Sequence, residues 1–152
     1  MLREFKETDI PGFLDIVDNN KETLEGLDEA FPYNKEYTRG ALKLMLDNES
    51  VLRTAYEKGG EMIGFSLGLI HPSLWDDSVI ELSELALNTS TLVPKVTQAR
   101  VQLALWTEME RLARARKVTR ITIAALNNYR MGERFMKKGY TKIAGTFTKE
   151  FK

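Results

Sequence analysis

The chain has 152 residues, a length that suits one domain with a substantial core, and it carries 22 Lys plus Arg against 22 Asp plus Glu. A formal net charge of zero gives no general attraction to nucleic acid or to an anionic membrane, so we expect neither as a partner. The sequence has no cysteine, which excludes disulfides and cysteine nucleophiles, and no apolar run reaches the roughly 20 residues that span a bilayer. We therefore expect a cytoplasmic protein.

Hydrophobic periodicity and turn residues predict alternating helices and strands along the whole chain. In chain order, the predicted elements are a strand over 2–6, a helix capped by Thr8 that ends at 19–20, a helix over 35–47, strands over 51–57, 62–70 and 79–87, a helix over 95–116, a strand over 118–125, a helix over 127–138 and two short strands between 140 and 151. Gly59 and Gly60 mark a hairpin between the second and third strands, because paired glycines accept the positive φ of a tight turn.

This order predicts one domain over 1–152 in the α/β (α+β) class, with a mixed, mostly antiparallel central sheet of six to seven strands flanked by about four helices. Strict alternation in the strand over 79–87 would place Glu81, Ser83 and Leu87 on one face, with Glu84 and Ala86 on the other. The apolar and threonine-rich run over 118–125 predicts a strand buried on both faces.

Four segments carry a resemblance to a known family. They are Glu-Leu-Ser-Glu-Leu-Ala-Leu at 81–87, Pro94, Lys-Val-Thr-Arg-Ile-Thr-Ile at 117–123, and Asn128 followed after a short helix by Gly139-Tyr140. Together they resemble the GNAT superfamily of acetyl-CoA-dependent N-acetyltransferases, in which the first segment matches the fourth strand and the third matches the fifth. The resemblance implies that fold and, if the chain is active, acetyl-CoA as the cofactor and a small-molecule or peptide amine as the substrate.

The resemblance also implies a set of site residues. A family general base most often lies on strand four, where Glu81 matches and Glu84 is its neighbour on the opposite face. The alternative for Glu81 is a glutamate that pairs with a nearby lysine or arginine. Residues that would contact the cofactor are Leu85 and Leu87 on strand four, Thr97, Arg100 and Gln102 after it, and Asn128.

The departures from the family pattern affect the cofactor-binding loop and the general acid. The family loop reads Arg/Gln-x-x-Gly-x-Gly/Ala, and its amides bind the coenzyme A pyrophosphate at the start of a helix. Here Thr97, Arg100 and Gln102 occupy its defining positions, so two long side chains replace glycines that let the backbone approach a phosphate. The tyrosine that often serves as general acid is Phe135, whose ring cannot protonate a thiolate.

Two hypotheses of different classes follow. The first is a non-catalytic GNAT-like protein that acts as an interaction or structural module, with a protein partner or a second copy of itself; the segment from Asn128 to Gly139 is similar to phage-encoded GNAT-like proteins, including small virion proteins. The second is an active N-acetyltransferase with a divergent loop. His71 is the only histidine, expected in a loop before Pro72, and one histidine without cysteines does not suffice for a metal site.

Overall fold

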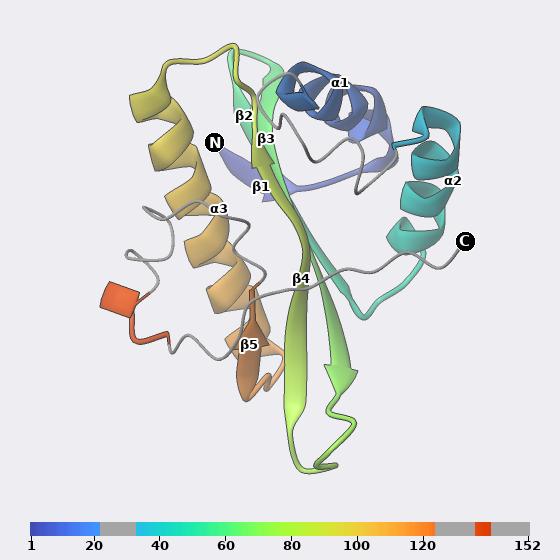
Figure 1. Ribbon diagram of the computed structural model, residues 1–152, viewed down its shortest axis with the longest axis vertical. Helices are drawn as coiled ribbons and strands as arrows, with labels where there is room; N and C mark the ends of the chain where they lie inside the picture. Colours follow the sequence, from blue (N-terminus) through green and yellow to red (C-terminus); the bar gives the residue numbers. More distant parts are fainter. Residues whose placement is uncertain (22–32, 124–135, 141–152) are drawn as a thin grey trace, which may run out of the picture. The chain divides into compact units, whose positions relative to one another are not determined.

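The computed structural model describes residues 1–21, 33–123 and 136–140 (Figure 1). Its strands are β1 (Leu2–Glu4), β2 (Val51–Lys58), β3 (Glu61–Pro72), β4 (Ile80–Thr89) and β5 (Arg120–Thr122), and its helices are the 3-10 helix η1 (Glu7–Asp9) and the α-helices α1 (Ile10–Lys21), α2 (Lys35–Leu46) and α3 (Lys95–Ala115). The strands form one sheet in the order β1-β2-β3-β4-β5. Neighbours are antiparallel except β4 and β5, which are parallel because α3 connects them as a crossover. The predicted mixed, mostly antiparallel sheet is therefore confirmed.

Residues 1–122 form one compact unit and residues 123–152 a second. In the second unit, the described residues 136–140 contain a helical turn that ends at Gly139, where φ is +91°. The last two predicted strands and most of the helix over 127–138 lie outside the described residues, so the described sheet has fewer strands than predicted. Within the described residues, no helix is both long enough and apolar enough to cross a membrane.

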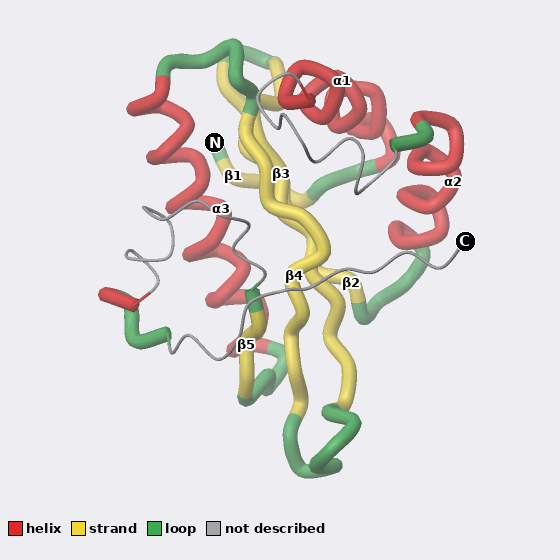
Figure 2. The backbone as a smooth tube through the Cα atoms, viewed as in Figure 1, coloured by secondary structure: helices red, strands yellow, loops and turns green. Residues whose placement is uncertain are grey.

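Helices α1 and α2 lie on one face of the sheet, and α3 lies on the other (Figures 1 and 2). The core under α1 is aromatic: Phe13 packs on Phe65 of β3 with ring centroids 4.0 Å apart, and Phe5 meets Phe13 edge-on at 6.2 Å. Leu14 of α1 is completely buried in the same core. Burial of these large apolar side chains fixes α1 against β3.

Two glycines on β3 allow α3 to pack closely against the sheet. A Cβ on Gly64 would lie 2.7 Å from Cγ1 of Val101, and one on Gly68 would lie 3.3 Å from Sδ of Met109. Gly64-Phe65-Ser66-Leu67-Gly68 also spells the Gly-x-Ser-x-Gly pattern of hydrolase nucleophile elbows, which requires a serine exposed on a sharp turn. Ser66 lies in the middle of β3 and is completely buried, so this pattern serves close helix packing instead.

Several predicted details are wrong. Thr8 does not cap the first helix: it lies inside η1, where the carboxylate of Asp9 accepts a hydrogen bond from the backbone N–H of Lys6 at 2.8 Å. The described part of the fifth strand is not buried on both faces, because Arg120 and Thr122 are exposed. The helix over 95–116 and the hairpin at Gly59-Gly60, with φ values of +63° and +86°, are confirmed.

Candidate functional site

The candidate site lies where β4 and β5 separate. The two strands pair only at Glu81↔Arg120, Leu82↔Ile121 and Ser83↔Thr122. Beyond Ser83, β4 continues to Thr89, and the described part of the chain supplies no strand on that side of it. Backbone polar groups on this stretch of edge can therefore bind a ligand.

A β-bulge in β4 sets the direction of those backbone groups. Leu67 pairs with Ala86 but Gly68 pairs with Glu84, which leaves Leu85 as the extra residue. Before the bulge, the carbonyl of Ile80 faces β5, since it accepts from Thr119 N at 2.9 Å. After it, Ser90 N donates to Ile63 on β3 at 2.9 Å, so by alternation Ala86 also faces β3 and Leu87 faces the open edge.

The bulge also corrects the predicted faces of β4. Glu84 pairs with Gly68, whose missing side chain would point at Leu82 and Met109, so Glu84 lies on the α3 face. Leu87, however, joins the core under α3, whereas Ala86 joins the core under α1. Strict alternation from Glu81 to Leu87 is therefore wrong, because one extra residue exchanges the faces beyond it.

The two candidate carboxylates have different surroundings. Oε1 of Glu81 accepts from Nη1 of Arg120 at 2.8 Å, and its side chain is 14% exposed. Glu84 is partly buried on the other face, and burial raises its pKa to about 7. Among the described residues no hydrogen bond or ion pair stabilises the Glu84 carboxylate. Glu84 is therefore the carboxyl group able to exchange a proton near neutral pH.

Helix α3 begins immediately after Pro94, and the three loop positions implied by the resemblance lie within its first two turns. Gln98 N donates to the carbonyl of Pro94 at 3.0 Å. Arg100 and Gln102 lie inside the helix, where each amide donates to the carbonyl four residues earlier. Only the first three amides of the helix, up to Thr97, lack such a partner. The free amides thus lie three to five residues before Arg100, which is about 5 to 8 Å along the helix axis.

Two side chains near the start of α3 form hydrogen bonds with the segment that precedes the helix. Gln102 Nε2 reaches Thr89 Oγ1 at 3.4 Å, and Gln98 Nε2 donates to the carbonyl of Val93 at 2.8 Å. The side chain of Arg100 is exposed. Leu92 and Val96, 78% and 65% exposed, present apolar surface beside the helix start, which does not favour a pyrophosphate there. These residues do not fit the family's manner of holding coenzyme A.

The loop between β4 and α3 is held by a residue that the sequence did not single out as functional. Asn20, at the end of α1, is buried; its Nδ2 donates to Asn88 Oδ1 at 2.7 Å and to the Thr89 carbonyl at 2.9 Å, while its Oδ1 accepts from Thr91 N at 3.2 Å. Asparagine at a helix end is typical of an ordinary stop signal, so nothing in the sequence links Asn20 to a loop 68 to 71 residues away. Asn128 and Phe135 lie outside the described residues.

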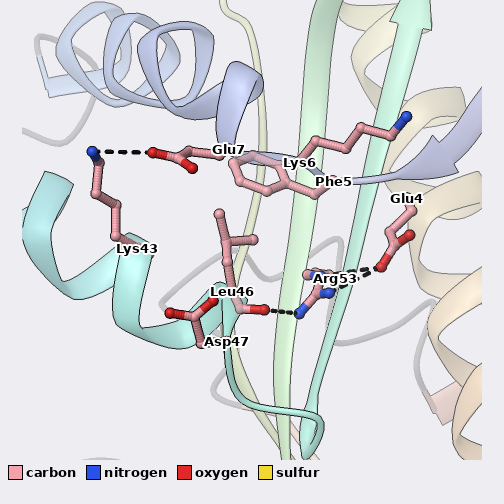
Figure 3. Close-up of a pocket in the computed structure, with 8 residues that line it drawn as sticks. All are labelled: Glu4, Phe5, Lys6, Glu7, Lys43, Leu46, Asp47 and Arg53. Atoms are coloured by element: carbon pink, nitrogen blue, oxygen red, sulfur yellow. Dashed lines mark hydrogen bonds and ion pairs between the residues drawn. The ribbon is translucent and has the colours of Figure 1, made fainter.

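A cavity of about 410 Å³ lies elsewhere, between β1, α2 and β2 (Figure 3). Its lining residues are Glu4, Phe5, Lys6, Glu7, Lys43, Leu46, Asp47 and Arg53. Arg53 binds Glu4 at 3.1 Å and the carbonyl of Leu46 at 2.6 Å, and Lys43 binds Glu7 at 3.0 Å. Most of its charges are thus paired within the wall, and we assign it no function. The described residues contain no cluster of His, Asp and Glu able to hold a metal ion.

The comparisons with known proteins agree on the fold. No family model matches the sequence, and no curated protein matches it. Among solved structures, a GNAT family acetyltransferase from Staphylococcus aureus has 17% identity and a TM-score of 0.70, covering 99% of this chain and 98% of that one. A possible acetyltransferase from Clostridium difficile has 10% identity, a TM-score of 0.73 and coverage of 99% and 96%. A ribosomal-protein-alanine N-acetyltransferase from Brucella melitensis has 11% identity, a TM-score of 0.68 and coverage of 100% and 99%.

These structural similarities extend over the whole chain, and they show that it has the GNAT acetyltransferase fold. The predicted fold and its resemblance to this superfamily are thus confirmed at the level of architecture. At such identities the similarity extends to fold alone. Function has to be argued from the site.

Proposed function

We propose that this chain is a GNAT-fold, acetyltransferase-like protein that does not load acetyl-CoA in the family's manner and instead acts by binding another protein or a second copy of itself. The observation that carries the proposal is the helical conformation of Arg100 and Gln102. Amides committed to a helix cannot also donate to a pyrophosphate, and side chains at both former glycine positions occupy the approach. An interaction role tolerates both changes.

The proposal implies a place in the host cytoplasm, and also in a virion if a phage encodes the chain. The ground for the virion role is the similarity of 128–139 to small phage virion proteins, a segment that lies mostly outside the described residues. Sedimentation of the purified chain measures self-association directly. If the chain stays monomeric at every concentration, self-association is excluded and binding to a different protein remains as the proposed function.

Calorimetric titration with acetyl-CoA tests the proposal, together with acetyl transfer to a panel of small amines and peptide amines. We expect no binding at ligand concentrations up to about 1 mM, which corresponds to a free energy weaker than about −4 kcal/mol. A micromolar dissociation constant would reject the proposal. Replacing both Arg100 and Gln102 with glycine is the matched variant: each glycine weakens the helix by about 1 kcal/mol. This variant should bind more tightly than the natural chain if the blocked amides are the obstacle.

The second candidate function is an active N-acetyltransferase, and one specific observation favours it. Glu84, with its pKa raised to about 7 by burial, lies beside the open edge of β4, where Leu87 presents its backbone N–H and C=O. Such a carboxylate could accept the proton of an ammonium substrate, directly or through water. Turnover that falls about 100-fold or more in Glu84→Gln, and not in the exposed control Glu61→Gln, would support this candidate.

A further inference from the structure

A hydrogen-bonded serine and histidine lie on the sheet face opposite α3, at the end where β5 joins. The structure places His71 in β3, not in the predicted loop. Its Nε2 lies 2.8 Å from Oγ of Ser83 on β4, and its Nδ1 lies 2.9 Å from the carbonyl oxygen of Pro72. Both contacts lie within the β3–β4 ladder, so the paired strands hold this geometry.

The hydrogen-bond partners of the His71 imidazole determine which ring nitrogen carries the proton. A carbonyl oxygen can only accept a hydrogen bond, so Nδ1 carries the hydrogen that it donates to Pro72. In the neutral ring Nε2 is then unprotonated and accepts from the hydroxyl of Ser83. A nucleophile bonded to a base, with the base oriented by a third group, is the arrangement that activates a serine.

The neighbouring residues keep this pair intact. Glu81 lies directly across from His71 in the register, and Arg120 lies next to Glu81 on β5. The carboxylate of Glu81 forms a 2.8 Å ion pair with Arg120, and the two ring nitrogens of His71 contact Pro72 and Ser83. His71 and Ser83 are both only partly buried, and the Arg120 side chain is 50% exposed. Solvent and a small reagent can therefore reach the pair of His71 and Ser83.

We propose that Ser83 and His71 form a nucleophilic dyad that accepts an acyl group from an activated ester or thioester. Ser83 Oγ bonds to the acyl carbon while the bond from that carbon to the leaving group breaks. The hydroxyl proton passes to Nε2 of His71 and then to the leaving alcohol or thiol. Water then attacks the acyl-serine, His71 takes its proton and returns it to Oγ, and a carboxylic acid is released. This activity does not depend on whether the chain binds acetyl-CoA.

The test uses p-nitrophenyl acetate as the acyl donor and the full chain as the protein. We expect release of p-nitrophenolate together with one acetyl group on the peptide that contains Ser83, identified by mass spectrometry. Ser83→Ala should abolish this adduct. His71→Gln keeps a hydrogen-bonding oxygen near Ser83 but cannot take its proton, so labelling should slow by at least about 10-fold.

Ser50→Ala is the control, because Ser50 is exposed and the ring nitrogens of His71 contact Pro72 and Ser83 instead. It should react like the natural chain. A purely structural cross-strand hydrogen bond predicts no adduct on Ser83, and that result overturns the proposal. Labelling of Ser83 at an unchanged rate in His71→Gln also overturns it. Urea unfolding of each variant confirms that a lost reaction is not a lost fold.

Discussion

Replacing Glu84 with glutamine should stabilise the chain above neutral pH and have almost no effect in acid. In the folded chain burial raises the pKa of Glu84 to about 7, against 4.5 for a solvated glutamate. The folded state therefore disfavours the carboxylate, and the unfolded state does not. Glutamine has nearly the same shape and carries no charge, so it removes only this penalty.

The direction follows from proton binding. Below about pH 4 both states hold the proton, and the buried carboxyl group imposes no penalty. As pH rises through the interval from 4.5 to about 7, the unfolded chain loses its proton first, so stability falls; above that interval the penalty is constant. Because each pH unit between the two pKa values is worth about 1.4 kcal/mol, the full penalty is about 3 kcal/mol.

Urea unfolding at about pH 4 and about pH 8 measures this difference, provided that both states stay soluble. Glu84→Gln should raise the free energy of unfolding by about 3 kcal/mol at the higher pH relative to the lower one. Glu61→Gln, at the exposed hairpin turn, is the control and should show no such dependence. Equal effects of Glu84→Gln at both pH values would show that Glu84 titrates as a solvated glutamate, and the argument for it as a base would fail.

Three further substitutions test the packing and the electrostatics. Gly64→Ala should destabilise by about 1–3 kcal/mol, because its Cβ would lie 2.7 Å from Cγ1 of Val101, whereas Gly40→Ala, in open space on α2, should stabilise by about 0.5–1 kcal/mol; thermal unfolding separates the two signs. For Asp9, burial opposes ionisation, but the bidentate bonds from Arg3 at 2.7 Å and the backbone N–H of Lys6 together lower its pKa. Asp9→Asn should therefore cost about 2–4 kcal/mol near neutral pH, and the difference from the natural chain should vanish as acid protonates Asp9; a constant difference down to about pH 2 would contradict this account.

The elements with strong local signals were predictable. Gly59 and Gly60 identify the hairpin because few other residues adopt their positive φ. The start of α3 at Lys95 follows from its apolar spacing and from the absence of glycine between Pro94 and Gln102, since every residue there tolerates a helix. The same absence predicts that the cofactor loop departs from the family pattern.

The features set by tertiary pairing were not predictable. Nothing in the residues around Leu85 indicates a bulge, because β3 decides which residue of β4 is left unpaired. The raised pKa of Glu84 depends on burial, and the pairing of Glu81 with Arg120 depends on the strand register. The contact of His71 with Ser83 also needs the β3–β4 ladder to extend to Pro72, beyond the predicted end of the strand.

The backbone amides at the start of α3 offer the most direct measurement. Amide hydrogen exchange followed by NMR, with and without about 1 mM acetyl-CoA, reports the helix and the ligand in one experiment. We predict that the amides of Arg100 and Gln102 are protected from exchange and that their resonances do not move when acetyl-CoA is added. Rapid exchange at both amides, with large shifts on addition of acetyl-CoA, would contradict the view that this helix has replaced the phosphate-binding loop.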